Sequence, residues 1–248
     1  MPPRHRVIAQ LIQRSIARGQ LSAAAGILSL PQLAQRFRVS STEELQLALA
    51  RLRSEGLIVM RGDLGPVVSD TPMLTQVMST SPGSHRPPLT RDVIFGDGAR
   101  RVGVTATGRS ETTVEPASLD VADQLEIARG TPIVHRRTVR YAGDMPAALE
   151  NAYYPHDIVA LVGPAADVET IIDAAGYRRV GQTDALVARL ASPDEATVLG
   201  LDTGSPVLDH ARVLYSSKDG HVRAVEHVRT LFAGNRNRLT YEHKQLDA

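Results

Sequence analysis

An internal repeat in the second half of the chain constrains the fold more than any other feature of the sequence. The segment 121–134 recurs as 195–208, with a leucine, a glycine and a proline at matching places in both copies. Each copy predicts a short helix, a Gly-x-Pro turn and a strand, and each continues through a second turn, at 143–144 or 219–220, into a returning strand. Hairpins related in this way usually lie beside one another in one antiparallel sheet, so the repeat predicts a pseudo-symmetric α+β domain.

Further elements are expected around the two copies. Before the first copy, the apolar residues of 93–95 and the alternation over 101–107 predict two strands, with a turn at 96–98 between them. Between the copies, 168–175 predicts a helix closed by a glycine, and 184–190 predicts another strand.

The first quarter of the chain has a different pattern, which runs through 33–68. Apolar residues at the start of this stretch lie on one face of a short helix. A second helix, capped by Ser41 or Thr42, follows with leucine and alanine at three- and four-residue spacing. Two short strands at 57–61 and 65–69 are then joined by a glycine-rich turn. Two small helices followed by such a hairpin predict a winged helix-turn-helix, whose second helix fits the major groove of DNA.

Charge is distributed unevenly along the chain. Nine arginines and three glutamates precede residue 63, a net charge of +6, which leaves −5 for the remainder because the whole chain carries +1. A basic module on an acidic body indicates a phosphate-binding surface, as in proteins that bind nucleic acids. The alternative is that several of these arginines only solvate helix faces.

Composition excludes several classes of protein. The chain has no cysteine, which rules out disulfides, thiol nucleophiles and cysteine zinc sites, and its eight histidines show no metal-binding spacing. No nucleophile-elbow motif supports a hydrolase. No apolar run approaches the roughly 20 residues that cross a bilayer, and the N-terminus leads into an amphipathic helix instead of a secretory signal. We therefore expect a cytoplasmic protein with no membrane span, no metal, no cofactor and no catalytic residue.

The segment between the two patterns is rich in proline, serine and threonine, which is typical of a linker. The expected domains are a winged helix-turn-helix over 1–70, a linker over 71–88 and an α+β domain over 89–248. Within the linker, the apolar residues of 73–78 predict a short helix that packs between the domains or against a second subunit.

Residues 33–58 resemble the DNA-binding domain of the GntR family of bacterial transcription regulators. The matching motifs are Leu-Ala-Gln-Arg-Phe, Val-Ser, Ala-Leu-x-Arg-Leu and Ser-Glu-Gly-Leu-Ile, and with the first helix the resemblance covers 7–68. The sequence departs from the family at Thr42 and Gln46, where such regulators usually carry arginine. The resemblance implies phosphate or base contacts to double-stranded operator DNA from Arg36, Arg38, Ser41, Thr42, Gln46, Arg51, Arg61 and Gly62.

The second half resembles UTRA, the effector-sensing domain of the HutC branch of the same family. The motifs are Leu-x-x-x-x-Gly-Thr-Pro, Arg-Tyr-Ala-Gly-Asp-Met-Pro, Tyr-Tyr-Pro and Gly-Ser-Pro-Val-Leu, spread over most of 89–239. The resemblance implies a chorismate-lyase-like fold with a cleft for a small-molecule effector. Because both halves occur in the family's order, we expect an effector-responsive repressor that binds an inverted-repeat operator as a homodimer.

Strand alternation places the candidate effector-binding residues on shared faces of the predicted sheet. In the family, arginines from the first hairpin and a glutamate from its returning strand hold the effector in a cleft on this sheet. Carried onto this sequence, the resemblance assigns Arg140, Glu150, Tyr154, Arg212 and Glu226, together with Arg236 in a turn near the end of the chain. The alternative is that Arg140–Glu150 and Arg212–Glu226 are cross-strand ion pairs on a solvated face of the sheet.

Two other hypotheses about function stay open. The missing arginines, together with Glu43 and Glu44, allow a ligand-sensing or partner-binding regulator whose DNA-binding module has degenerated. An enzyme is the third hypothesis, and it rests only on the fold that the sensing domain shares with chorismate lyase.

Overall fold

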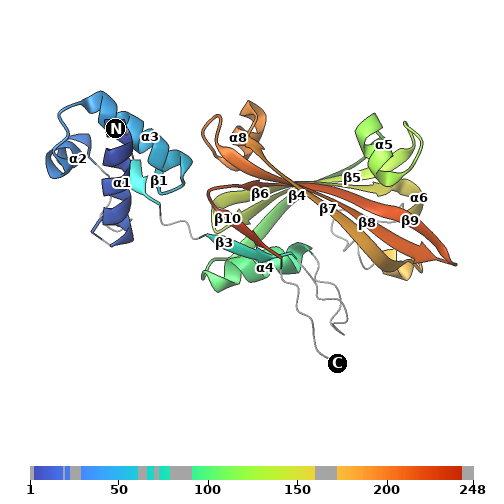
Figure 1. Cartoon of the computed structure of the whole chain (residues 1–248). Helices are drawn as coiled ribbons and strands as arrows, with labels where there is room; N and C mark the ends of the chain where they lie inside the picture. The colour runs from blue at the N-terminus through green and yellow to red at the C-terminus, as the bar shows by residue number, and fades with distance from the viewer. Residues whose placement is uncertain are drawn as a thin grey trace. The chain divides into compact units, whose positions relative to one another are not determined.

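The computed structural model describes residues 3–18, 20–22, 29–60, 66–69, 73–78, 91–159 and 172–241 (Figure 1). The chain divides into two compact units, Met1–Met73 and Leu74–Ala248, which are described separately. None of the described helices combines the length and the apolar character needed to span a membrane.

The N-terminal unit is the expected winged helix-turn-helix. Its core joins apolar side chains from all three helices and from the first strand, among them Ile12, Leu33, Leu45 and Ile58. Ser41 caps the third helix, since its side chain accepts a hydrogen bond from the Glu44 amide. The elements are α1 (Arg4–Ala17), α2 (Leu30–Phe37), α3 (Thr42–Ser54) and the antiparallel strands β1 (Ile58–Met60) and β2 (Pro66–Val68).

The C-terminal unit is built on one antiparallel sheet of six strands, in the order β4-β5-β6-β9-β8-β7. The first three strands come from one copy of the repeat and the last three from the other. The strands are β4 (Ala106–Pro116), β5 (Pro132–Ala142), β6 (Met145–Pro155), β7 (Arg178–Leu190), β8 (Pro206–Lys218) and β9 (His221–Ala233).

The expected pseudo-symmetry is present, and each copy proves to be a strand-helix-strand-strand unit. Helices α5 (Leu119–Leu125) and α8 (Pro193–Leu199) follow the edge strands β4 and β7. Returning strands β6 and β9 meet at the centre of the sheet, with Asn151 opposite Arg229. Each copy therefore begins one strand earlier than the recurring sequence motif, because β4 and β7 precede it.

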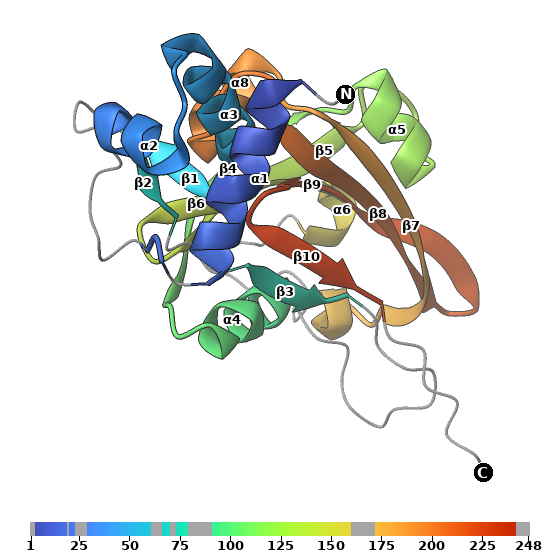
Figure 2. The same cartoon turned by 60° about the vertical axis from the view of Figure 1, so that its left-hand side comes forward.

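The two faces of the sheet carry different layers (Figures 1 and 2). Helices α5 and α8 pack on one face. The opposite face carries α4 (Arg91–Arg101), α6 (His156–Val159), and the parallel strands β3 (Leu74–Val77) and β10 (Asn237–Thr240).

The strand predicted at 93–95 is wrong, because this segment lies in helix α4; of the strand predicted at 101–107, only 106–107 are strand, as the first residues of β4. Ile94, Phe95 and Ala99 are buried at helical spacing. Gly98 suits this helix because a Cβ there would lie 3.1 Å from the carbonyl oxygen of Thr75, so the glycine lets α4 approach β3 closely. Of the two glycines that predicted a turn, Gly98 therefore belongs to the surface of α4 that packs on β3, while Gly96 has open space around it.

The helix predicted over 73–78 is also wrong, because this segment forms β3. Leu74, Gln76 and Met78 are buried while the residues between them are partly exposed, which is the period of a strand. Of the helix predicted over 168–175, residues 172–174 are helical and 168–171 lie outside the described residues, as does the tip of the wing.

Candidate functional site

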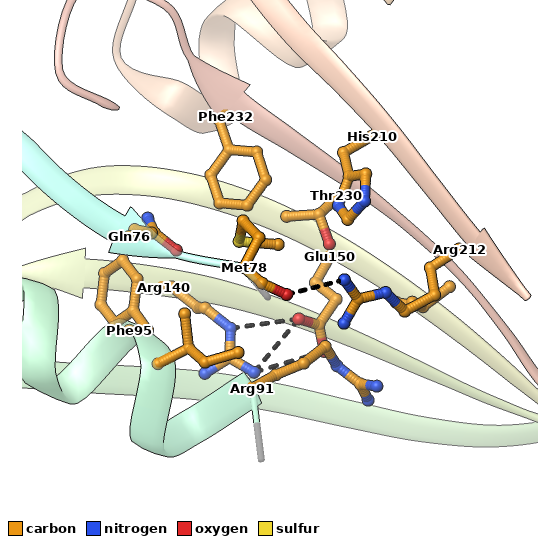
Figure 3. A pocket seen from close by; sticks show the side chains of 12 residues that line it. Gln76, Met78, Arg91, Phe95, Arg140, Glu150, His210, Arg212, Thr230 and Phe232 are labelled. Atoms are coloured by element: carbon orange, nitrogen blue, oxygen red, sulfur yellow. Dashed lines mark hydrogen bonds and ion pairs between the residues drawn. The ribbon is translucent and has the colours of Figure 1, made fainter. Parts of the chain in front are cut away.

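A cleft opens in the C-terminal unit between the sheet, α4 and β3 (Figure 3). Its empty space, including the part open to solvent, is about 360 Å³. The lining residues are Gln76, Met78, Arg91, Ile94, Phe95, Arg140, Glu150, His210, Arg212, Val228, Thr230 and Phe232. The cleft thus combines apolar and aromatic walls with a few charged groups, which is the usual character of a small-molecule site.

A cluster of ion pairs forms one wall of this cleft, at the start of α4. The Arg91 guanidinium lies 2.7 Å from Glu226 Oε1 and 3.2 Å from Glu150 Oε1, and its Nη2 donates to the Tyr154 hydroxyl at 2.9 Å. Arg140 donates to Glu150 at 3.1 Å and to Asp92 at 2.6 Å. Glu150 therefore bridges two arginines, one from the helix and one from the sheet.

Ionisation in this cluster is set by a balance between burial and charge. Burial alone would raise the pKa of Glu150, but Arg91 and Arg140 outweigh it and hold the pKa below its ordinary value. Burial would likewise lower the pKa of Arg91, yet Glu150 and Glu226 raise it well above the ordinary value. Both side chains consequently remain charged at neutral pH.

A second charged cluster lies on strands β7 and β8. Asp184 Oδ1 accepts from Arg212 Nε at 2.6 Å and lies 2.8 Å from His210 Nε2, which is also 3.2 Å from the Tyr241 hydroxyl. Burial would raise the pKa of Asp184, but the hydrogen bonds from His210 and Arg212 lower it well below the ordinary value. Asp184 thus fixes the orientation of two cleft-lining side chains.

Arg212 also connects this cluster to β3. Its Nη2 donates to the carbonyl oxygen of Met78 at 3.3 Å (Figure 3). Within the described part of the chain, Nη1 of Arg212 makes no hydrogen bond. A guanidinium with a remaining donor beside apolar walls suits a ligand that has an anionic or carbonyl group.

Three of the six residues assigned to the effector lie in the cleft lining, namely Arg140, Glu150 and Arg212. Tyr154 and Glu226 lie behind it and reach it through Arg91. The Arg140–Glu150 pair exists but is buried, and Arg212 pairs with Asp184 instead of Glu226.

Arg236 is not brought to the cleft. Its buried guanidinium donates to the backbone carbonyls of Pro146, Leu199 and Gly200, and so ties the end of α8 to the β5–β6 turn. The Arg236 side chain thus has a structural role, holding backbone segments together.

Several cleft residues were not predicted from the sequence. Arg91 and Phe95 belong to helix α4, in whose place a strand over 93–95 was predicted, and Gln76 in β3 and the adjacent Met78 belong to a segment that was predicted as helix. His210 was detectable, because strand alternation places it two residues before Arg212 on the same face. In the described ranges, no group of three or more metal-binding side chains occurs.

The candidate DNA-binding surface is the exposed face of α3. Thr42 and Gln46, which were predicted to contact bases, are both exposed, and such a contact requires exposure. The centre of this face also carries Glu43, Leu47 and Ala50, none of which was assigned a contact. No basic residue lies in this central row, so its chemistry differs from that of an arginine-rich recognition helix.

The basic residues assigned to phosphate contacts surround that face. Arg36 and Arg38 are exposed at the end of α2, and Arg36 donates to the Gln20 carbonyl at 3.3 Å. Arg51 pairs with Glu55 at 2.8 Å. Arg61 and Gly62 lie outside the described residues.

A winged helix-turn-helix joined to a pseudo-symmetric α+β unit with a polar cleft defines a DNA-binding transcription regulator. The UTRA domain family matches residues 104–238, more than half of the chain. The chain therefore belongs to the GntR family of transcription regulators, and its UTRA domain is consistent with the HutC branch.

Relatives with assigned names are regulators of the same kind. An HTH-type transcriptional regulator of Mycobacterium tuberculosis is 31% identical, over 84% of this chain and 73% of its own. The HTH-type transcriptional repressor NagR of Bacillus subtilis is 25% identical, over 92% of this chain and 90% of its own. The crystal structure of PhnF from Mycobacterium smegmatis has the same fold, with a TM-score of 0.57 and 21% identity over 96% of this chain and 99% of its own.

Proposed function

We propose that this protein is an effector-responsive repressor that binds an inverted-repeat operator as a homodimer and is controlled by a small molecule in the cleft. One observation carries the proposal. Strand β3 is the first element after the DNA-binding unit, and its Gln76 together with the adjacent Met78 lines the cleft. A ligand in the cleft therefore touches the segment that leads directly to the DNA-binding unit.

The operator contacts follow from the exposure of α3 and its neighbours. Thr42, Gln46 and the hydroxyl of Ser41 contact base edges in the major groove, while exposed arginines contact phosphates and fix the register. The repressor role is supported by the name of the relative NagR. Operator binding requires a cytoplasmic location, which is part of this proposal.

The chemistry of the cleft defines a class of effector. Arg212 and His210 suit an anionic or carbonyl group, Glu150 and Thr230 suit hydroxyl groups, and Phe95 and Phe232 cover an apolar or ring-shaped body. We therefore propose a small polar metabolite with one acidic end.

Coupling between effector and operator uses the contact of Arg212 with β3. An acidic ligand competes with the Met78 carbonyl for the Arg212 guanidinium, and this changes how the sheet holds the strand. By linkage, effector and operator then alter each other's affinity by the same factor.

The test begins with operator binding by the purified protein. DNA flanking its own gene is compared with scrambled DNA at two salt concentrations by fluorescence anisotropy. Preference for the native fragment that persists at higher salt supports the proposal, whereas equal and strongly salt-dependent binding to both fragments contradicts it.

The effector arm uses compounds that raise the melting temperature of the protein. These are then tested for a change in operator affinity, in the wild type and in Arg212→Met. The variant should keep operator binding and lose the response. Arg223→Met is the matched control, because Arg223 pairs with Asp157 outside the cleft lining and its loss should leave the response unchanged.

A regulator with a degenerate DNA-binding module is the second candidate function. It is favoured by the exposed central row of α3, which carries Glu43 and no positively charged side chain. In that case Thr42→Ala and Gln46→Ala leave any residual DNA binding unchanged, whereas in a sequence-specific regulator they abolish the preference for the native fragment.

A further inference from the structure

His210 belongs to the cleft lining, and one of its two ring nitrogens already has fixed partners. Its Nε2 lies 2.8 Å from Asp184 Oδ1 and 3.2 Å from the Tyr241 hydroxyl. The other ring nitrogen, Nδ1, makes no hydrogen bond within the described part of the chain. The side chain is buried and comes from the same strand as Arg212, two residues away (Figure 3). One nitrogen of His210 is therefore engaged by the fold, and the other is left for a ligand.

The state of Asp184 decides which nitrogen of His210 carries the hydrogen. Burial would raise the pKa of Asp184, but hydrogen bonds from His210 and Arg212 keep it below its ordinary value, so the carboxylate is ionised at neutral pH. An ionised carboxylate only accepts hydrogen bonds, so Nε2 of His210 carries the hydrogen. Nδ1 is then the atom at which the imidazole gains or loses a proton. It is an acceptor in the neutral ring and a donor in the charged ring.

The charges around His210 balance while its imidazole is neutral. Asp184 on β7 contributes one negative charge and Arg212 on β8 one positive charge, and the two pair at 2.6 Å. Glu150, which lies beyond β9 in the same row across the sheet, already bridges two arginines of the neighbouring cluster. The other neighbours of His210, from β7, β9, β3 and the end of β10, carry no charge at neutral pH: Leu186, Thr230, Phe232, Met78 and Tyr241.

An acidic group bound at Nη1 of Arg212 changes this balance. It brings a second negative charge to a buried end of the cleft, which then holds one net negative charge away from water, at a high cost in free energy. A proton on Nδ1 of His210 restores neutrality and makes that nitrogen a charged donor for the acid. We propose that the cleft takes up one proton from solvent, onto His210, together with the acidic group of its effector. The imidazolium and Arg212 then hold this group, while Asp184 stays ionised between them.

This inference deepens the proposed function, and it rests on that function in one respect, which is that the effector carries an acidic group. Because proton and acid bind together, each increases the affinity for the other by the same factor. Affinity for an acidic ligand should fall by up to about tenfold per unit as the pH rises through the range in which an imidazole loses its charge. The response of the regulator to a given concentration of effector therefore depends on pH.

The probe for this proposal is benzoate, whose carboxylate suits Arg212 and His210 and whose ring suits the aromatic walls at Phe95 and Phe232. Isothermal titration calorimetry of the full-length chain, in buffers that differ in ionisation enthalpy, counts the protons taken up on binding. We expect an uptake that approaches one proton per benzoate as the pH rises from 6 to 8, with the affinity falling over the same range. Benzamide has the same shape without the charge and should bind with no uptake.

Two variants assign the proton to its residue. His210→Gln keeps an amide donor for Asp184 but cannot take up a proton, so its affinity for benzoate should not depend on pH. His135→Gln is the matched control, because His135 contacts Asn151 and Glu115 and is not part of the cleft lining; it should behave as the wild type. Thermal melting establishes that both variants are folded. Nitrogen NMR of histidine-labelled wild type needs no substitution, and excess benzoate should convert Nδ1 of His210 from an unprotonated to a protonated nitrogen.

Three results would overturn the inference: benzoate that binds without proton uptake, a pH dependence that persists in His210→Gln, or His210 signals that do not respond to excess benzoate. Operator binding by the same preparation separates this inference from the proposed function. A cleft that takes up a proton with benzoate, in a protein with no preference for the native fragment, leaves the inference standing and removes the repressor. A sequence-specific regulator whose cleft binds benzoate without a proton does the reverse.

Discussion

Replacing Arg91 by methionine tests whether the ion-pair cluster holds α4 to the sheet. Methionine keeps much of the apolar stem of arginine but removes its charge and donors. Glu226 then loses the contact at 2.7 Å and Glu150 the one at 3.2 Å, while the Tyr154 hydroxyl loses a donor at 2.9 Å. The Glu150 and Glu226 side chains are only 4% and 3% exposed, so water replaces little of what is lost.

The expected magnitude follows from the cost of leaving a buried charge without its partner, about 3–5 kcal/mol. A domain of this size shifts its melting temperature by roughly 2–4 °C per kcal/mol. The C-terminal unit of Arg91→Met should therefore melt roughly 6–20 °C lower at pH 7, by differential scanning calorimetry. Arg100→Met is the matched control on the same helix, because Arg100 is 78% exposed in its pair with Asp97. It should melt close to the wild type, since exposed pairs contribute little.

The pH dependence gives an independent check with a defined sign. The pKa of Glu150 is lowered in the folded protein, so its ionised form contributes stability above the unfolded pKa of about 4.3. That contribution disappears as the pH falls toward the folded pKa. The difference in melting temperature between wild type and Arg91→Met should therefore become smaller as the pH falls. Equal melting temperatures at pH 7, or a difference that becomes larger below pH 4, would refute the assignment of Arg91 as the counter-ion of this buried cluster.

Four further substitutions test other parts of the structure. Asp184→Asn should destabilise the C-terminal unit by roughly 1.5–3 kcal/mol at pH 7 in urea unfolding. The difference from wild type should shrink as acid protonates Asp184, whose pKa is lowered in the fold. Gly234→Ala should destabilise by more than about 1 kcal/mol, because its Cβ would lie 2.7 Å from the Pro206 carbonyl oxygen. Gly96→Ala, with open space around it, should stabilise α4 by about 0.5–1 kcal/mol instead. On a mapped operator, Gln46→Ala should relax discrimination at one base pair by about 1–3 kcal/mol, measured by competition binding; unchanged discrimination would count against its base contact.

The parts of the fold that the sequence predicts are those with local or repeated signals. The two hairpins and their helices were predicted because glycine, proline and apolar spacing recur in both copies. Strand β4 was missed because it is an edge strand that is exposed on both faces, so its side chains show little alternation. Helix α4 was missed because Gly96 and Gly98 suggest a turn. The backbone oxygen of Thr75 that explains Gly98 belongs to a segment far away in the sequence.

The candidate site was predicted only in part for a related reason. Arg140, Glu150 and Arg212 lie on regular strands, where alternation identifies the face. Their partners come from elsewhere: Arg91 is 135 residues from Glu226, and Arg212 is 134 residues from Met78. Pairing over such separations is decided by tertiary packing. The local sequence therefore gave no indication that Arg212 pairs with Asp184 instead of Glu226.

The duplicated architecture of the C-terminal unit has a consequence for ligand orientation. Across β5 and β6, Thr138 stands opposite Glu150, whereas across β8 and β9 the equivalent pair is Arg212 and Val228. One half thus presents a carboxylate where the other presents an aliphatic side chain, and a cation where the other presents a hydroxyl. A duplicated backbone alone would offer a ligand two equivalent orientations. The side-chain differences between the two halves make these orientations unequal. Because these side chains are distributed asymmetrically, we expect a molecule with one acidic and one hydroxylated end to bind the cleft in a single orientation.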